Sequence, residues 1–199
     1  AANGDRRTEG LAEGMLGTIA MLSGDFALAS RHYAHALSVQ RAIGDRVHEA
    51  LIVFNDAELK ARSGRDEEAA DGFLRAVELA RANRDPQAEG AALGWLAALR
   101  TRTGDREAAE ADFARAGALL REAGDLMELT KVVCRMGDSA LSAGDLTTAR
   151  RHLDDARAAA EGLSLDENAE LSVMISGFTR ALVTASGGGQ QPESPQKLA

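Results

Sequence analysis

Gly-Asp pairs recur along this 199-residue chain in steps of 20 residues, and this punctuation limits what the chain can fold into. The pairs stand at 4/5, 24/25, 44/45, 104/105, 124/125 and 144/145, and Gly64 and Asp85 keep the same phase. Glycine suits the left-handed position just past a helix end, and aspartate suits the N-cap of the following helix. The segments between the pairs carry Ala and Leu at helical spacing and almost no Pro. Each unit of 20 residues is therefore predicted to be one helix followed by a tight turn.

Alternate units match better than neighbouring units, so the repeat is 40 residues long. The second helices share three columns of small residues: Gly24, Gly64, Gly104 and Gly144; Ala29, Ala69, Ala109 and Ala149; Ala36, Ala76, Ala116 and Ala156. Between the two alanine columns lies a large apolar column, formed by Tyr33, Phe73, Phe113 and Leu153. The first helices share a small residue, which is Gly17, Ala57, Ala97, Gly137 and then Gly177. We expect these small residues to face the Ala29 column, so that paired helices approach closely and the large residue fills the adjacent groove.

This pattern resembles the tetratricopeptide repeat (TPR) family. The family combines a small residue in the first helix, a Gly-Asp-like turn, and then Ala, an aromatic residue and Ala in the second helix. The first repeat supplies these as Gly17, Gly24-Asp25, Ala29, Tyr33 and Ala36. The resemblance extends over about residues 10–184. Two features depart from the family: the repeat is longer than the usual length of about 34 residues, and the proline that often ends the second helix is missing.

The resemblance implies an all-α fold, an α-α superhelix (a TPR-like solenoid) of about four helix-turn-helix repeats plus a C-terminal capping helix. The predicted repeats and capping helix are at about 6–44, 45–84, 85–124, 125–164 and 167–184. We expect the solenoid to occupy residues 1–185 and residues 186–199 to form a flexible tail, since that stretch is rich in Gly, Gln, Ser and Pro. Its last residues, Lys197-Leu198-Ala199, resemble vector-derived sequence.

Composition excludes several classes of partner. The formal net charge of −8 disfavours nucleic acid, which needs a basic surface. No apolar run approaches the roughly 20 residues of a membrane span. The single cysteine is compatible with a reducing cytoplasm, which is the predicted location. An excess of Arg over Lys together with many Ala residues indicates a bacterial source with GC-rich DNA.

No constellation of residues predicts catalysis, a metal site or a cofactor. His32 and His35 lie three residues apart on a predicted helix, but no third ligand is spaced with them. Cys134 has no base near it in sequence and is expected to be a buried or groove-lining thiol. We therefore expect a protein that is not an enzyme.

Function in the TPR family resides in the concave groove lined by the first helices, and the resemblance transfers this role by position. The implied groove residues are Met15, Phe54, Asn55, Glu58, Arg62, Trp95, Arg102, Lys131, Arg135, Asp138 and Phe178. Apolar surface beside basic side chains suits an amphipathic helix or an acidic-hydrophobic peptide. The positions of the family's carboxylate clamp hold Gly14/Thr18, Phe54/Glu58, Gly94/Ala98 and Cys134/Asp138, so a chaperone-tail clamp is not expected.

The leading hypothesis is a non-catalytic scaffold that binds a protein or peptide, as the sensory or adaptor fragment of a larger signalling regulator. A solenoid presents a large preformed surface at little cost in ordering, which favours recognition. Two alternatives stay open. The first alternative is a small-molecule-sensing TPR region of a transcriptional regulator. The second is a self-association module that forms a homodimer through its apolar C-terminal helix.

Overall fold

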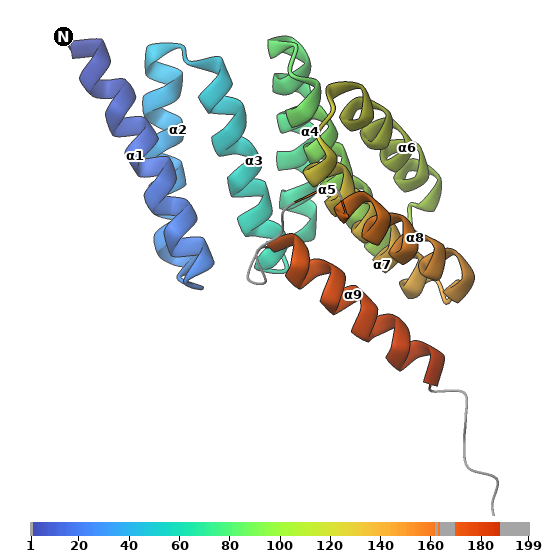
Figure 1. Cartoon of the computed structure of the whole chain (residues 1–199). Coiled ribbons are helices and arrows are strands. Elements are labelled where there is room, and N and C mark those ends of the chain that lie inside the picture. Colours follow the sequence, from blue (N-terminus) through green and yellow to red (C-terminus); the bar gives the residue numbers. More distant parts are fainter. Residues whose placement is uncertain (1, 162, 164–169, 188–199) are drawn as a thin grey trace, which may run out of the picture.

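The computed structural model describes residues 2–161, 163 and 170–187, and in these residues it contains nine helices and no strand. The helices are α1 Ala2–Leu22, α2 Phe26–Ile43, α3 Arg46–Arg62, α4 Asp66–Asn83, α5 Pro86–Thr103, α6 Arg106–Ala123, α7 Leu126–Ser142, α8 Leu146–Ala160 and α9 Glu170–Gly187. Consecutive helices pack against each other as antiparallel pairs, and the pairs stack into a curved row (Figure 1). The predicted all-α superhelix is confirmed.

The turns follow the predicted chemistry closely. Six glycines of the 20-residue punctuation have positive φ, from 71° to 91°, among them the C-caps Gly44, Gly104 and Gly124. Arg84 occupies the equivalent left-handed position without being glycine, at φ 56°. Six helices, α2, α3, α5, α6, α7 and α8, begin with an Asp whose carboxylate accepts a hydrogen bond from a backbone N–H three residues later. At the start of α4 this position holds Arg65, which makes no side-chain cap.

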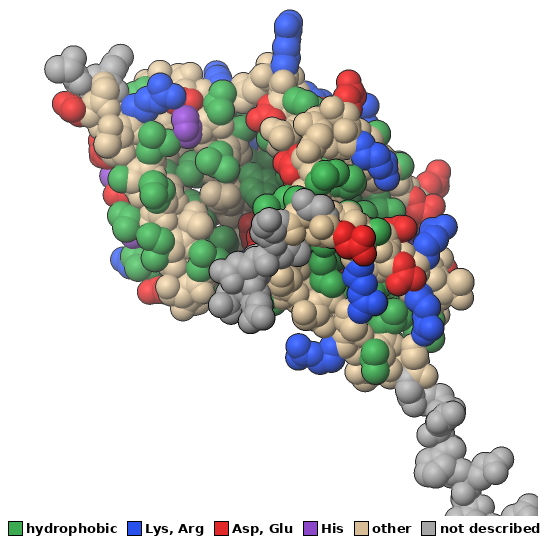
Figure 2. All heavy atoms as spheres, in the orientation of Figure 1, with side chains coloured by type: hydrophobic (Ala, Val, Ile, Leu, Met, Phe, Trp, Pro, Cys, Tyr) green, Lys and Arg blue, Asp and Glu red, His purple; other side chains and the backbone are tan. Residues whose placement is uncertain are grey.

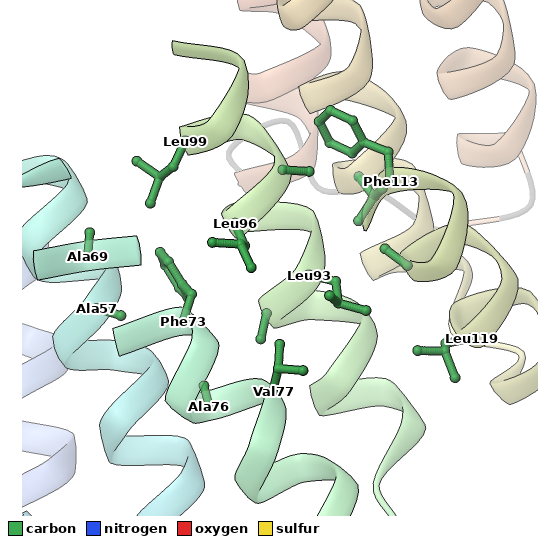
Figure 3. Close-up of a cluster of buried hydrophobic side chains, with 14 of the residues drawn as sticks. Ala57, Ala69, Phe73, Ala76, Val77, Leu93, Leu96, Leu99, Phe113 and Leu119 are labelled. Atoms are coloured by element: carbon green, nitrogen blue, oxygen red, sulfur yellow. The ribbon is translucent and has the colours of Figure 1, made fainter. Parts of the chain in front are cut away.

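The repeated columns form the core. The Ala29 column, the Ala36 column and the large apolar column are all buried. The central cluster joins α3 to α7, and in Figure 3 the ring of Phe73 lies among Ala57, Ala69, Ala76 and Leu96. The periodic residues are therefore buried, as their spacing predicts.

In the first two repeats, the contact made by the small residue of the first helix differs from the prediction. A Cβ atom on Gly17 would lie 2.6 Å from the ring of Tyr33, so this glycine faces the large column and not the Ala29 column. Ala57 instead lies against Gly72, whose added Cβ would be 2.7 Å from that of Ala57. The small residues thus admit either a neighbouring ring or a neighbouring backbone, whichever the opposite helix presents.

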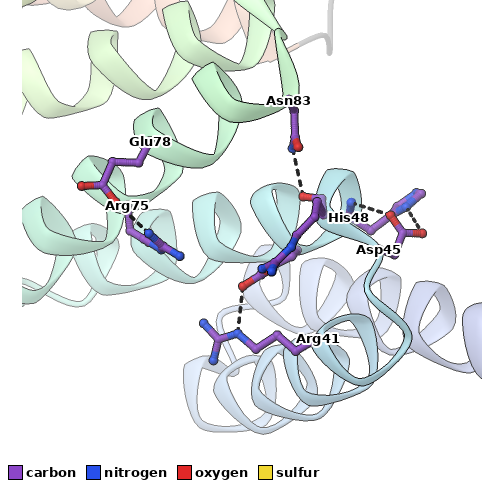
Figure 4. A network of polar contacts seen from close by, with 8 residues as sticks. Arg41, Asp45, His48, Arg75, Glu78 and Asn83 are labelled. Atoms are coloured by element: carbon purple, nitrogen blue, oxygen red, sulfur yellow. Dashed lines mark hydrogen bonds and ion pairs between the residues drawn. The ribbon is translucent and has the colours of Figure 1, made fainter.

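Ion pairs across the turns tie successive repeats together. The carboxylate of Glu49, in the first turn of α3, is buried and accepts hydrogen bonds from Arg41 of α2 at 2.9 Å and from Arg46 at 2.8 Å. Arg81 and Glu89 repeat the same contact 40 residues later, also at 2.9 Å. Figure 4 shows the contact made by Arg41, together with the bond from the Asn83 amide to the Arg46 carbonyl oxygen.

The buried carboxylate predicts an acid dependence of stability. Burial alone raises the pKa of Glu49, but the hydrogen bonds from Arg41 and Arg46 outweigh it, and the pKa is lowered from its ordinary value. The pair therefore stabilises the fold above the ordinary pKa of about 4.5, and this contribution is lost as the pH falls through the lower folded value. In Glu49→Gln we expect the free energy of unfolding, measured by urea titration, to fall less between about pH 5 and pH 3 than in the wild type. Glu78→Gln, at an exposed pair with Arg75, is the control, and equal acid slopes in all three proteins would contradict the prediction.

The last helix closes the row of repeats. α9 packs on α7 and α8, and its buried side chains are Leu171, Phe178 and Leu182. The repeat register predicted Gly177 as the packing residue, but nothing lies within 4 Å of a Cβ built there. The buried set is therefore shifted by one residue from the 40-residue register, with Phe178 buried in place of Gly177. The start of the predicted capping helix at 167–169 and the tail from residue 188 lie outside the described residues.

Among the described residues, no helix has the length and apolar character needed to cross a membrane.

Candidate functional site

A groove lies on the concave side, where the first helices of successive repeats meet the closing helix. Its volume is about 540 Å³, and we name it the Trp95 groove. It is lined by Arg62 of α3, by Trp95, Ala98, Thr101 and Arg102 of α5, by Arg135, Asp138, Ser139 and Ser142 of α7, and by Glu170, Val173 and Met174 of α9. In Figure 2 this face of the molecule is hollowed between the N-terminal helices and the C-terminal ones.

An aromatic stack leads into the groove from the core. The rings of Phe54 and Phe73 meet edge to face at a centroid distance of 5.5 Å. Phe73 then stacks on Trp95 with centroids 5.7 Å apart and planes 9° from parallel. The guanidinium carbon of Arg135 lies 4.3 Å from the centroid of the Trp95 ring, as in a cation–π contact. The indole is therefore held in place by neighbours from α4 and α7 before any partner binds.

Arg135 and Asp138 bring opposite charges into the groove from successive turns of α7. Arg135 is buried and pairs with Glu128 at 3.4 Å; burial lowers the pKa of its guanidinium, which remains charged. Asp138 reaches solvent, but the groove walls partly desolvate its carboxylate and raise its pKa, and the charge of Arg135 opposes that rise. Among the described residues lining the groove, Asp138 is the carboxylate that has no ion pair or side-chain hydrogen bond.

The other charges of the groove are already engaged within the chain. The pairs are Arg62 with Glu58 at 2.6 Å, Arg102 with Asp66 at 2.6 Å, and Lys131 with Glu170 at 2.7 Å. Burial lowers the pKa of Lys131, but the hydrogen bond to Glu170 and the charges of Glu128 and Glu170 outweigh it, so the pKa is raised. The basic side chains are thus less available to an acidic peptide than their sequence pattern predicts.

The structure brings together five of the predicted groove residues and separates the others. Arg62, Trp95, Arg102, Arg135 and Asp138 line the Trp95 groove. Lys131 adjoins it through Glu170, and Glu58 adjoins it through Arg62.

Four predicted residues lie elsewhere. Phe54 lines a second, smaller pocket of about 270 Å³ with Val47, Ala50, Leu51, Ala76 and other residues of α3 to α5. Asn55 is half-buried on α3, and Met15 is exposed on α1; neither lines the Trp95 groove. Assigning Phe178 to the groove is wrong, because its ring is buried over Gly137 in the core between α7, α8 and α9.

Sequence reasoning missed the polar rim and the far wall of the groove. Thr101, Ser139 and Ser142 are rim residues, and Ser142 continues the helical spacing set by Arg135 and Asp138. Whether Glu170 and Val173 line the groove depends on where α9 packs, and the repeat pattern does not predict that position. Helical spacing could therefore have identified the polar residues of α7 but not those of α9.

Reactive side chains elsewhere are held in structural contacts. His32 and His35 meet Glu13 at 2.6 and 3.4 Å and tie α1 to α2. Burial raises the pKa of Cys134 to about 11, which leaves the thiol protonated. No group of three or more metal-ligating side chains occurs among the described residues.

Comparison with solved structures decides the architecture. The chain is similar to BtubC (BKLC) from P. vanneervenii, with a TM-score of 0.67 and 19% identity over 94% of this chain and 84% of that one. It is also similar to a Rap protein solved in complex with the Competence and Sporulation Factor, with a TM-score of 0.74 and 18% identity over 91% of this chain and 53% of that one. The fold is a helical-repeat superhelix.

Both similar proteins are distant from this chain in sequence. Identities below one fifth show a shared fold alone, and the chain spans about half the length of the Rap protein. No protein-family model and no curated protein matches the sequence.

Proposed function

We propose that this chain is a non-catalytic scaffold that binds a peptide or a segment of another protein in the Trp95 groove. The observation that carries the proposal is the preformed position of Trp95, held between helices at the floor of a groove of about 540 Å³. Tryptophan in a rigid, partly desolvated pocket is typical of the residues that dominate protein recognition. Such a site loses little conformational freedom on binding.

The partner that fits best has an apolar side chain and a hydrogen-bond donor or cation close to it. Apolar contact is offered by Trp95, Val173 and Met174, and Asp138 offers an unpaired carboxylate. This proposal replaces the expected acidic-hydrophobic peptide with one that carries a donor or a cation, because the arginines of the groove already have carboxylate partners. A cation placed at Asp138 would compensate a charge that the fold leaves unpaired.

The wider assignment rests on the repeat pattern and on the neighbours in fold. We propose a TPR-type array with 40-residue repeats that serves as the sensory or adaptor part of a larger bacterial, cytoplasmic signalling protein. The similar Rap protein was solved with a bound factor, which supports a recognition role for this superhelix. Sensing of a small molecule in the same groove is the alternative, and thermal shift in the presence of sugars and metabolites tests it.

The proposal is tested with peptides selected from a displayed random-peptide library on the immobilised protein. We expect Asp138→Lys to weaken binding of the selected peptides about tenfold or more, since it places a cation where the partner's donor binds. Asp154→Lys makes the same charge reversal on an exposed site of α8 and should leave the affinity unchanged. Both residues are exposed, so both variants should fold. Equal affinities for the two variants would show that the groove is not the binding site.

A further inference from the structure

A second pocket, of about 420 Å³, lies inside the array between the third repeat and the fourth. Its walls come from the end of α5 and from α6, α7 and α8. Within the described chain, α6 and α8 both pack on α7 but not on each other. We name this space the His152 pocket. Thr101 and Ser139 line both this pocket and the Trp95 groove, so the two sites share one wall, and neither α1 nor α9 contributes to the lining of the pocket.

The 40-residue register shows what fills the equivalent place one repeat earlier. Ala140 of α7 and His152 of α8 correspond to Arg100 of α5 and Asp112 of α6. Arg100 donates a hydrogen bond to the Asp112 carboxylate at 2.5 Å, so this ion pair joins the two helices of the third repeat. In the fourth repeat both partners are replaced, and Ala140 and His152 line the pocket instead. The chain thus leaves space where its own preceding repeat places an arginine side chain.

A second large-to-small difference adds to this space. Ser139 takes the place of Leu99, which is 1% exposed in the core of the preceding interface. Ser139 is half-buried and brings a hydroxyl group to the wall of the pocket. An unfilled cavity in a packed interior lowers stability, and a bound molecule restores contacts to its walls. Two such differences at one interface therefore point to an occupant.

His152 supplies the pocket with a buried polar group that the fold leaves unpaired. It is 8% exposed, and its Nδ1 atom lies 3.9 Å from the Asp155 carboxylate, which is too far for a hydrogen bond. No other polar partner of the ring occurs among the described residues. Burial lowers the pKa of the imidazole, and the charge of Arg151 adds to this effect, whereas Asp155 and Asp145 oppose it. A neutral imidazole has one nitrogen that donates a hydrogen bond and one that accepts.

The remaining lining favours an uncharged aromatic molecule over an ion. Phe113 and Met136 line the pocket, and a phenyl ring and a thioether both pack well against an aromatic ring. The charged side chains of the lining are Arg106, Glu110 and Asp145, which are exposed and together carry a net negative charge that opposes an anion. A cation would meet these carboxylates only in contact with solvent, where ion pairs contribute little.

We propose that the His152 pocket binds a small uncharged aromatic molecule with a hydroxyl group, which is a phenol in chemical class. The ring packs against Phe113 and Met136, in the space that the Arg100 side chain fills one repeat earlier. The hydroxyl group pairs with the unpartnered imidazole of His152. The volume of the pocket lies within the usual range for small-ligand sites. Binding here is independent of the peptide site proposed in the Trp95 groove.

Fluorine NMR titration with para-fluorophenol tests the chemistry of the site. We expect saturable binding, with fluorobenzene about fivefold weaker because it lacks the hydroxyl group, and no binding of para-fluorobenzoate. His152→Phe keeps an aromatic ring in the wall and should remove the preference for the phenol over fluorobenzene. Equal binding of the three compounds overturns the proposal, and so does a chain that binds no para-fluorophenol up to its solubility limit.

Filling the pocket tests its location. Ala140→Arg/His152→Asp installs the ion pair of the third repeat and should abolish binding of para-fluorophenol, and Ser139→Leu should weaken it about tenfold. Ala111→Arg adds the same side chain at an exposed position of α6 outside the pocket and should leave binding unchanged. Circular dichroism verifies that each variant is folded. Wild-type affinity in the folded double variant and in Ser139→Leu would place the bound phenol elsewhere and overturn the assignment.

N-acetyltyrosine amide separates the two sources from which a phenol could come. It carries the same group on a peptide backbone, and we expect it to bind more weakly than para-fluorophenol. Tighter binding of the tyrosine compound would assign the pocket to a side chain of a protein partner and overturn the small-molecule assignment. Loss of peptide binding in Asp138→Lys has no bearing on this pocket, because Asp138 does not line it.

Discussion

Replacing Phe73 with alanine is expected to lower the free energy of unfolding by about 3–5 kcal/mol, the largest loss from any single truncation in this chain. The ring is fully buried in the central cluster that joins α3 to α7. It also contacts Phe54 and Trp95, so its removal leaves a cavity and breaks both ring contacts. Urea unfolding followed by circular dichroism measures the loss.

Leu74 provides the matched control for this substitution. It is the next residue on α4 and is exposed, so Leu74→Ala should change the free energy of unfolding by less than about 1 kcal/mol. A small effect of Phe73→Ala, comparable to that of Leu74→Ala, would show that the aromatic column does not hold the repeats together.

Replacing Gln40 with leucine is expected to raise the free energy of unfolding by about 1–3 kcal/mol. Gln40 is fully buried between α1 and α2, and neither its amide nitrogen nor its amide oxygen has a hydrogen-bond partner in the described structure. The repeat shows that leucine fits: Leu120 takes the equivalent place on α6 and packs over Gly90 as Gln40 packs over Gly10. Thermal unfolding at neutral pH measures the gain.

A double-mutant cycle separates hydrogen bonding from volume at this site. The pair Ala50 and Ala80 stands in the second repeat where Gly10 and Gln40 stand in the first. Gly10→Ala alone should destabilise, because its Cβ would lie 2.7 Å from the Gln40 amide nitrogen, whereas Gly10→Ala/Gln40→Ala should be tolerated. A less stable Gln40→Leu protein would mean that the amide is satisfied in solution, for example by a buried water.

The sequence predicts those parts of the fold that local chemistry decides. Gly44 and Asp45 act within one turn, as a left-handed C-cap and an N-cap, so their spacing alone predicts the helix boundary. The alanine and aromatic columns are predictable because each repeat packs in the same way on its neighbour. Arg65 stands at an N-cap position and Arg84 at a left-handed C-cap position, where the pattern has Asp and Gly. The fold tolerates both because tertiary packing holds the adjacent helices.

The site was harder to predict, for identifiable physical reasons. Trp95 and Arg135 were assigned to the groove by position, but their mutual contact depends on side-chain orientations that spacing does not specify. The pairing of Arg102 with Asp66 joins the end of α5 to the start of α4, 36 residues earlier in the chain, and leaves the groove less basic than its composition. Phe178 was misplaced because the buried residues of α9 lie one residue out of the repeat register. The ring of Phe178 is buried where the register predicts Gly177.

The most direct test of the central claim, that the Trp95 groove is the binding surface, is the fluorescence of its indole. The chain contains a single tryptophan, so its emission reports on this groove alone. The account predicts that library-selected peptides shift the Trp95 emission saturably, with a midpoint equal to the calorimetric Kd, and that Asp138→Lys moves both together. Peptides that bind by calorimetry without changing the emission, and with the same affinity for Asp138→Lys, would contradict it.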